Sequence, residues 1–247
     1  MRIGLFDSGV GGFTVFKKVV ELFPNSSFIY LADTARLPYG VKTSNEIIKI
    51  AEEVSSWFSH QNIDVFLVAC NTTNAIALDV IKNKLDVPIF DLIESASTTI
   101  KESRVGVLAT PSTVKTKAYT KAILNLSPTT FVIEQSCPEF VPMIEMNNIN
   151  SNQINDIAIG YIEPLLKQKI ESLILGCSHY PLITPLLTEL LPSSVKLIDP
   201  AEALSLKLKL FIDSKTSNSA NKKSLLDSKF YVTSDPKNFS IRAKHWL

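Results

Sequence analysis

Two of the three cysteines occupy the same kind of position in the sequence. Cys70 follows the apolar run Val65–Ala69, and Cys177 follows the run Leu173–Gly176. Each run is short enough to predict a buried strand, and the residues after each cysteine predict a helix. Ligand crevices of open α/β sheets lie at this end of the strands. Because the helix dipole and free N–H groups stabilise a thiolate, we expect the pKa of each thiol to fall, which makes each a plausible base.

A cysteine after Val and Leu is often just a small buried hydrophobe, and that is the better interpretation for one cysteine alone. Here two lie at equivalent points, and both are followed by hydroxyl and amide or imidazole side chains. One thiolate on each side of a cleft could take a proton from one face of a carbon acid and return one to the other face, which is a racemisation. Cys137, between Ser136 and Pro138, has no such mate, so we expect it to serve packing.

A glycine-rich loop, Asp7-Ser8-Gly9-Val10-Gly11-Gly12, follows the first predicted strand. Three glycines in one loop predict a close approach of the backbone to another group. A dinucleotide fingerprint would need glycine at Thr14, and the Gly-Lys-Ser/Thr of a P-loop is missing. Two interpretations remain: an anionic group such as a substrate carboxylate at the helix N-terminus, or a plain tight turn capped by Asp7.

His179 is the histidine that the pattern places near a thiol, two positions after Cys177. His60 is expected at the exposed end of a helix, and His245 in a terminal helix. Cys177 and His179 could instead bind a metal, but no second pair has the required spacing, so we predict no metal site. A cysteine hydrolase would use the Cys-His pair and leave Cys70 without a role.

Short apolar runs alternate with helix-like stretches along the chain, which predicts a parallel α/β fold. The stretches 1–93 and 104–206 can also be laid over one another, which indicates an internal repeat. Strands of similar composition could produce this match by chance, but the paired cysteines argue against that. The repeat aligns Ile3–Ser8 with Val105–Thr110, Phe28–Asp33 with Phe131–Ser136, Val65–Thr72 with Leu173–His179, and Pro88–Asp91 with Lys196–Asp199.

We therefore predict two α/β domains with a cleft between them. The first comprises residues 1–93 completed by 207–247, and the second comprises 94–206. Within the C-terminal segment, the polar stretch Asp213–Lys223 predicts a mobile loop. A strand at Phe230–Thr233 and a short helix ending at Trp246 are expected after it.

Composition limits the possible partners. The net charge is +1 and 20% of the residues are charged, so no global field would attract nucleic acid or an anionic membrane. No apolar run approaches the roughly 18 residues of a membrane helix, and no signal segment is seen. Three cysteines without a Cys-x-x-Cys pair fit a reducing compartment, so the cytoplasm is the expected location.

With these residues identified, the chain resembles the bacterial glutamate racemases from Ile3 through the terminal helix. The motifs that carry the resemblance are Phe6–Gly12, Asp33–Gly40, Ala69–Thr72, Cys137–Glu145 and Gly176–Pro181. The resemblance implies two pseudo-symmetric α/β domains, an active site between them, and interconversion of L- and D-glutamate without a cofactor. It also implies supply of D-glutamate to peptidoglycan synthesis, and a homodimer.

The resemblance also implies roles for individual residues. Cys70 would abstract the proton from D-glutamate and Cys177 from L-glutamate. Asp7 would support Cys70, while Glu145 and His179 would support Cys177. Substrate contacts would come from Asp7, Ser8, Tyr39, Gly40, Asn71, Thr72, Ser178 and His179.

One residue departs from the family pattern, and two other functions are the nearest alternatives. Ser178 replaces the usual threonine of the family but keeps the hydroxyl, so we expect binding with altered packing. Aspartate racemases resemble the chain around both cysteines but usually carry glutamate where this sequence has His179, which favours glutamate as substrate. An amino-acid-binding protein with a two-lobed cleft is the alternative from another class, but it would not need two thiols there.

Overall fold

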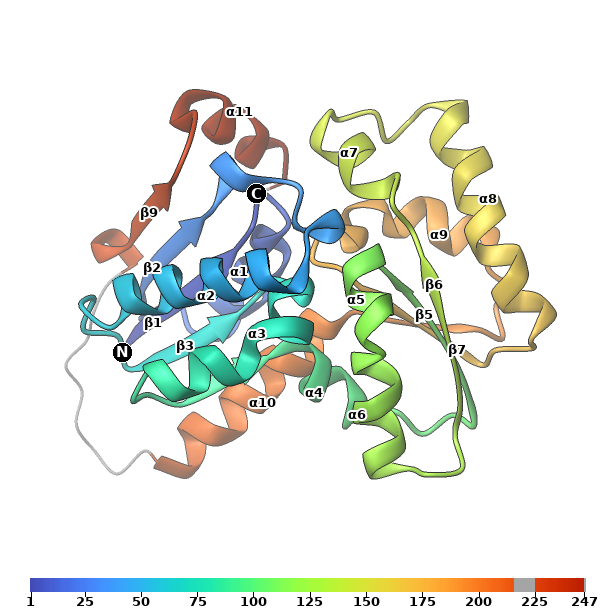
Figure 1. Ribbon diagram of the computed structural model, residues 1–247, viewed down its shortest axis with the longest axis horizontal. Coiled ribbons are helices and arrows are strands. Elements are labelled where there is room, and N and C mark those ends of the chain that lie inside the picture. The colour runs from blue at the N-terminus through green and yellow to red at the C-terminus, as the bar shows by residue number, and fades with distance from the viewer. Residues whose placement is uncertain (216–224, 247) are drawn as a thin grey trace.

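The computed structural model describes residues 1–215 and 225–246 of the 247-residue chain. These residues form two parallel sheets that lie side by side, each with helices on both faces (Figure 1). Strands buried on both faces need nearly continuous apolar sequences, which is what the short apolar runs provide. The predicted parallel α/β class is confirmed.

The first sheet has five strands in the order β4-β3-β1-β2-β9, and all neighbours are parallel. The strands are β1 (Arg2–Asp7), β2 (Ser27–Ala32), β3 (Val65–Val68), β4 (Ile89–Asp91) and β9 (Lys229–Val232). β1 lies at the centre, so the residues after it face the middle of the carboxyl edge. The expected strand at Phe230–Thr233 is β9, shifted by one residue.

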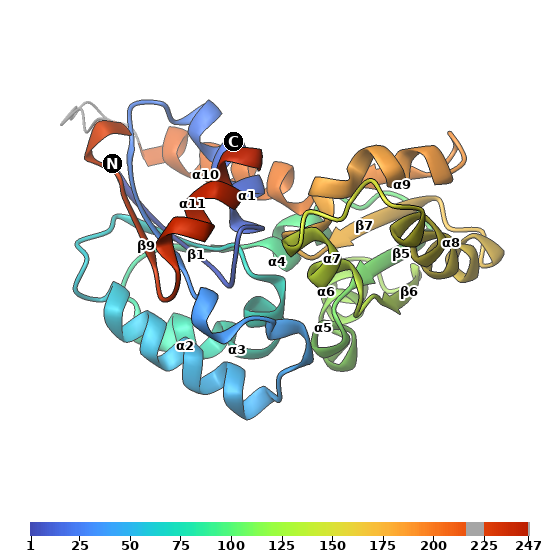
Figure 2. The same ribbon diagram turned by 90° about the horizontal axis from the view of Figure 1, so that it is seen from above.

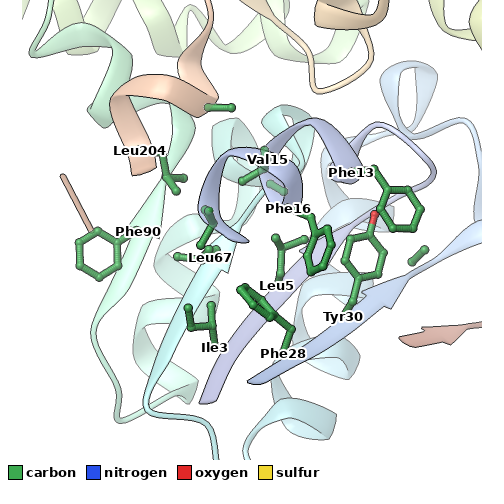
Figure 3. Packing of buried hydrophobic residues seen from close by; sticks show 14 of the residues in the cluster. Ile3, Leu5, Phe13, Val15, Phe16, Phe28, Tyr30, Leu67, Phe90 and Leu204 are labelled. Carbon is green, nitrogen blue, oxygen red and sulfur yellow. The ribbon is translucent and has the colours of Figure 1, made fainter. Parts of the chain in front are cut away.

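One face of this sheet is covered by three helices: α1 (Gly12–Leu22), α10 (Pro200–Lys215) and α11 (Pro236–Trp246). Alternate side chains of the strands, such as Ile3 and Leu5, point into this cluster. Figure 3 shows its centre, where aromatic rings of α1 lie close to rings on β2. The C-terminal segment is therefore part of the core around the first sheet.

The opposite face of the first sheet is covered by α2 (Ser44–Phe58) and α3 (Asn71–Lys84), which pack on side chains such as Phe6 and Val68. α3 begins directly after Cys70, so the cysteine lies between β3 and its following helix.

The second sheet has four parallel strands in the order β6-β5-β7-β8. Its strands are β5 (Arg104–Ala109), β6 (Phe131–Ser136), β7 (Ser172–Gly176) and β8 (Lys196–Ile198). One face is covered by α7 (Phe140–Glu145), α8 (Asn152–Lys167) and α9 (Thr184–Leu190). The other face is covered by α5 (Pro111–Thr116) and α6 (Ala118–Leu126).

The two sheets share one strand order. Read from one edge, the first is β4-β3-β1-β2 and the second is β8-β7-β5-β6, so each strand has its equivalent in the other sheet. This agreement confirms the internal repeat. Cys70 follows β3 and Cys177 follows the equivalent β7.

Two helices connect the sheets. In α4 (Leu92–Ser97), Leu92 belongs to the first core while Ile93 and Ala96 belong to the second, and the helix lies between the sheets in both views (Figures 1 and 2). The predicted junction at 93–94 falls inside α4, and that at 206–207 falls inside α10. Buried residues of α10 on both sides of residue 206 pack in the first core, so the whole helix belongs there although it directly follows β8 of the second sheet. We propose that the chain passes between the two domains at α4 and at the start of α10.

α10 extends further than the sequence suggested. Asp213 to Lys215 form its last turn, so the loop predicted there is wrong, and the remainder of the predicted loop lies outside the described residues. An ion pair between Lys209 Nζ and Asp213 Oδ2, 2.6 Å apart, spans one helical turn and supports the extension. Within the described ranges, no helix has the length and apolar character to cross a bilayer.

Candidate active site

Cys70 lies at the carboxyl edge of the first sheet, as its N-cap position before α3 requires. It is only 3% exposed, and its thiol donates a hydrogen bond to Ser8 Oγ at 3.8 Å. Burial and, secondly, the nearby Asp7 carboxylate raise the pKa of Cys70 to about 12. The expected fall in this pKa is therefore wrong, because desolvation and a like charge outweigh the helix N-terminus.

Cys177 lies at the matching edge of the second sheet, directly after β7, and is also buried. It does not lead straight into an α-helix as predicted: a 3₁₀ turn, η3 (Tyr180–Ile183), comes first, and α9 follows. In an α-helix that began directly after Cys177, the N–H groups of residues 181 and 185 would bond to the carbonyls of residues 177 and 181. Pro181 and Pro185 have no N–H group to make these bonds. The sulfur lies 3.8 Å from Nδ1 of His179.

Both cysteines line the same cavity, one from each sheet. Its free volume is about 20 Å³, enough for about one water molecule. Of the sequence-predicted residues, all the substrate-contact candidates except Asp7 line it. The described residues that line it are Ser8, Leu37, Tyr39, Gly40, Cys70, Asn71, Thr72, Thr110, Val141, Cys177, Ser178 and His179.

Asp7 does not line the cavity but is fully buried and binds the glycine loop. Its Oδ2 accepts hydrogen bonds from the N–H groups of Gly9 at 2.9 Å and Gly12 at 3.0 Å. Its Oδ1 accepts one from Ser178 Oγ at 3.0 Å. Burial raises the pKa of Asp7, although the charge of His179 and then these hydrogen bonds oppose the rise.

The glycine loop makes the close approach that its composition predicted, and the group it approaches is the second domain. A Cβ on Gly11 would lie 2.5 Å from His179 Nδ1 and 2.5 Å from Ser178 Oγ. The loop amides are occupied by the protein's own carboxylates, Asp7 and also Glu145, which accepts from Val10 N at 3.4 Å. These contacts favour the turn stabilised by Asp7 over an external anion at the start of α1.

Glu145 and His179 form a buried pair beside Cys177. Glu145 Oε1 lies 2.6 Å from His179 Nε2. Burial alone would lower the pKa of His179, but its hydrogen bonds to Cys177 and Glu145 raise this pKa well above its usual value. Burial would raise the pKa of Glu145, but His179 and Arg242 lower it. Both shifts favour the charged forms, an imidazolium beside a carboxylate, and His179 is also in contact with the Cys177 sulfur.

Comparison with known proteins agrees with this geometry. The family model described as Asp/Glu/Hydantoin racemase matches residues 3–206. The chain belongs to this family. A glutamate racemase of Prochlorococcus marinus (strain NATL1A) is 77% identical, covering 100% of this chain and 93% of its own length, and one of Synechococcus sp. (strain CC9605) is 45% identical, covering 99% and 93%.

A solved structure adds a bound ligand to the comparison. The Francisella tularensis glutamate racemase, crystallised in complex with D-glutamate, superposes with a TM-score of 0.92 at 34% identity, covering 100% of this chain and 93% of that one. The two α/β domains described above are therefore the architecture of a glutamate racemase, and the expected resemblance is confirmed.

Residues that do not line the cavity hold Tyr39, one of the first-domain residues that do. The Tyr39 hydroxyl donates to Asp33 Oδ2, and Arg36 Nε donates to the same oxygen at 2.5 Å. Burial, followed by the Asp33 charge, raises the pKa of Tyr39, so its phenol stays protonated. Gly40 is needed because a Cβ there would lie 2.7 Å from Thr110 of the second domain.

Asn71 provides an unused hydrogen-bond donor at the cavity. Its Oδ1 accepts from the Tyr119 hydroxyl at 2.6 Å, which fixes the amide, while its buried Nδ2 has no protein partner. A buried donor without a partner is costly unless a ligand or water meets it. Ser178 is different, because its hydroxyl hydrogen is directed to Asp7.

Two threonines of the second domain were missed at the sequence level. Thr110 Oγ1 lies 2.9 Å from Thr72 Oγ1 and 3.0 Å from Thr113 Oγ1, so three hydroxyls meet where the domains touch. Thr110 lines the cavity itself. The repeat contained the signal, because it aligns Ser8 with Thr110.

The other cysteine and histidines lie where expected, or outside the described side chains. Cys137 is buried in the second core, with its thiol directed to Gln135 O at 3.5 Å, and it does not line the cavity. His60 is exposed at the end of α2. The side chain of His245 is not among those the structure describes. Among the side chains that the structure describes, no three of His, Cys, Asp or Glu form a metal-binding group.

Proposed function

We propose that this chain interconverts L- and D-glutamate without a cofactor, using Cys70 and Cys177 as two opposed acid/base residues. The observation that carries the proposal is the shared cavity: each thiol enters it from a different domain and has its own polar partner. The names of the similar proteins support glutamate as the substrate. Peptidoglycan synthesis in the cytoplasm would consume the D-glutamate, and the working form would be a homodimer.

In the D-to-L direction, the Cys70 thiolate takes the Cα proton. The electron pair of the C–H bond moves into the α-carboxylate, and the Cys177 thiol delivers its proton to the opposite face of Cα. The reaction ends with Cys70 protonated and Cys177 as thiolate, which is the form that accepts L-glutamate. Each enantiomer therefore has its own protonation form of the enzyme, and no other reactant is consumed.

The neighbours of the thiols suit this cycle. His179 can exchange a proton with Cys177 and is held by Glu145. Cys70 is close to Ser8 and to the Asp7 charge, and its raised pKa makes the thiol a strong base once deprotonated. The positive α-ammonium group of a bound amino acid would offset the buried negative charges of Asp7 and the Cys70 thiolate. The cavity must widen for glutamate to enter, so we propose that the domains separate about α4 and α10.

The proposal is tested by incubating the protein with L-glutamate in deuterated water. We expect optical rotation to fall to zero while deuterium enters Cα. The D-glutamate formed first should carry deuterium at Cα in every molecule, because its new hydrogen comes from the Cys70 thiol, which exchanges with the solvent. The double variant Cys70→Ala/Cys177→Ala is the control and should show neither change. Binding of glutamate without exchange would contradict the proposal and identify a binding protein.

The pKa of Cys70 predicts a pH dependence. Because this pKa is raised, the thiolate is a minor form at neutral pH, and kcat/KM should increase by about tenfold per pH unit at most. Asp7→Asn removes the charge that raises the pKa, while an amide oxygen can still accept from Gly9 and Gly12. The rising limb of the kcat/KM profile should move to lower pH in this variant. An unmoved limb would show that Asp7 does not act on the base.

A further inference from the structure

Arg242 belongs to α11, a helix fixed to the first domain. Phe239 and Ala243, on the same side of the helix, are buried in the first core, and the Phe239 ring lies 5.5 Å from that of Phe13. Arg242 lies one turn after Phe239, and its side chain is 32% exposed. The position of its backbone is therefore set by the packing of the first domain.

The guanidinium of Arg242 reaches into the second domain. Its Nη1 donates to Glu145 Oε2 at 2.6 Å, and Glu145 is the last residue of α7. The other carboxylate oxygen, Oε1, contacts His179 Nε2 at 2.6 Å. His179 Nδ1 in turn lies 3.8 Å from Cys177 Sγ. Four side chains thus form an unbroken series of contacts from α11 to one of the two thiols.

This series constrains how Glu145 can lie. Its side chain is only 12% exposed, and its ion-pair partners among the described residues are His179 and Arg242. Removing one partner of a largely buried ion pair leaves a carboxylate oxygen without compensation. Without Arg242, the carboxylate would turn toward water or share His179 between its oxygens, and the imidazole would lose its fixed orientation.

No equivalent series leads to Cys70 among the residues that the structure describes. Within the described part of the chain, the Cys70 thiol has Ser8 and Thr73 as hydrogen-bond partners, and the carboxylate that acts on it, Asp7, is held by loop amides and Ser178. Arg242 contacts none of these groups. The series reaches the Cys70 side only indirectly, through the bond from Val10 N to Glu145 and the charge of His179 on Asp7, so a change at Arg242 should affect proton transfer at Cys177 more than at Cys70.

We propose that Arg242 is a positioning residue that holds Glu145, and through it His179, in the orientation required for proton transfer at Cys177. The proposal rests on the two-thiol reaction proposed above. It makes the C-terminal helix part of the active-site support, although none of the described side chains of this helix lines the cavity.

The test compares Arg242→Met with Arg242→Lys and with Lys244→Met, which removes a positive charge from an exposed position of the same helix. Enantiomers have equal free energies, so kcat/KM must be the same in both directions for every variant. We expect Arg242→Met to lower it roughly 10- to 100-fold, as a misplaced catalytic group does. Arg242→Lys should lose less, and Lys244→Met should match the unmodified protein.

Primary isotope effects with Cα-deuterated substrates show which thiol is affected. If transfer at Cys177 is slowed, the isotope effect on kcat/KM should rise with L-glutamate, whose Cα–D bond Cys177 breaks. It should fall with D-glutamate, whose Cα–D bond Cys70 breaks before the slow delivery step. Isotope effects that move together, or an unchanged kcat/KM in Arg242→Met, would overturn the proposal.

Two further measurements keep the result decisive. Melting temperatures and circular dichroism identify any variant that is not folded, and Arg242→Lys then provides the isotope effects. Cys177→Ala in an otherwise unmodified chain tests the two-thiol reaction by itself, and racemisation by that variant would refute the proposed function. If Cys177→Ala does not racemise glutamate but the two isotope effects of the Arg242 variant move together, only the role of Arg242 is refuted.

Discussion

Cys70→Ala and Cys177→Ala should each abolish racemisation, with kcat/KM reduced at least about a thousandfold. Abstraction and delivery occur on opposite faces of Cα, and each thiol enters the cavity from its own domain. One thiol cannot serve both faces. Serine at either position should fail as well, because a hydroxyl is far less acidic than a thiol.

Cys137→Ala is the matched control, since Cys137 is an equally buried thiol that does not line the cavity. It should retain kcat/KM close to that of the unmodified protein. Activity would be followed by optical rotation and by loss of the Cα proton in deuterated water. In Cys177→Ala, any remaining exchange should be confined to D-glutamate, and in Cys70→Ala to L-glutamate. Full racemisation by either single variant would refute the two-base reaction.

The positions of both cysteines could be predicted because the signal is local and occurs twice. A short apolar run followed by Cys and polar residues indicates a strand end wherever it occurs, and parallel strands bring such ends to one edge. The common strand order of the two sheets then places Cys70 and Cys177 at equivalent points. The fold class follows from the same alternation of short apolar runs and helical stretches.

The electrostatics of the site could not be predicted in this way. The pKa of Cys70 depends on its burial and on Asp7, which is 63 positions away in the sequence, so the local helix-start rule gives the wrong direction. The partners of the glycine loop, Ser178 and His179, come from the other domain. Arg242 approaches Glu145 from the C-terminal helix. Such contacts arise only when the two halves are assembled.

Local rules also failed where individual residues interrupt a pattern. A continuous α-helix from Ser178 would place Pro185 in its interior, where the missing N–H breaks the hydrogen-bond pattern, and the segment forms a 3₁₀ turn first. The segment after Cys70 contains no proline and forms α3 directly. The polar end of α10 remains helical through Lys215 because Phe211 and Ile212, just before it, pack on the first core, while the exposed ion pair of Lys209 with Asp213 adds little. These differences make the two halves of the repeat similar in architecture but chemically distinct.

A second large effect is expected in substrate choice: kcat/KM for L-glutamate should exceed that for L-aspartate by about a thousandfold or more. The proposed site for the distal carboxylate is the start of α3, where Asn71 Nδ2 is buried without a protein partner. Thr72 and Thr110, whose hydroxyls bond to each other across the domain junction, line the same cavity as Asn71. A substrate one methylene shorter cannot reach these donors while its Cα remains between the thiols, so the donors stay unpaired.

Two variants test whether this site sets the preference. Asn71→Ala removes the donor, and Tyr119→Phe removes the hydroxyl that fixes the amide through Oδ1. Both should lower kcat/KM for L-glutamate more than for L-aspartate, with the larger change in Asn71→Ala. Asn125→Ala, at an exposed position of α6, is the matched control and should leave the ratio unchanged. Equal kcat/KM values for the two amino acids in the unmodified protein, or a preference for aspartate, would show that Asn71 does not select glutamate by binding its distal carboxylate.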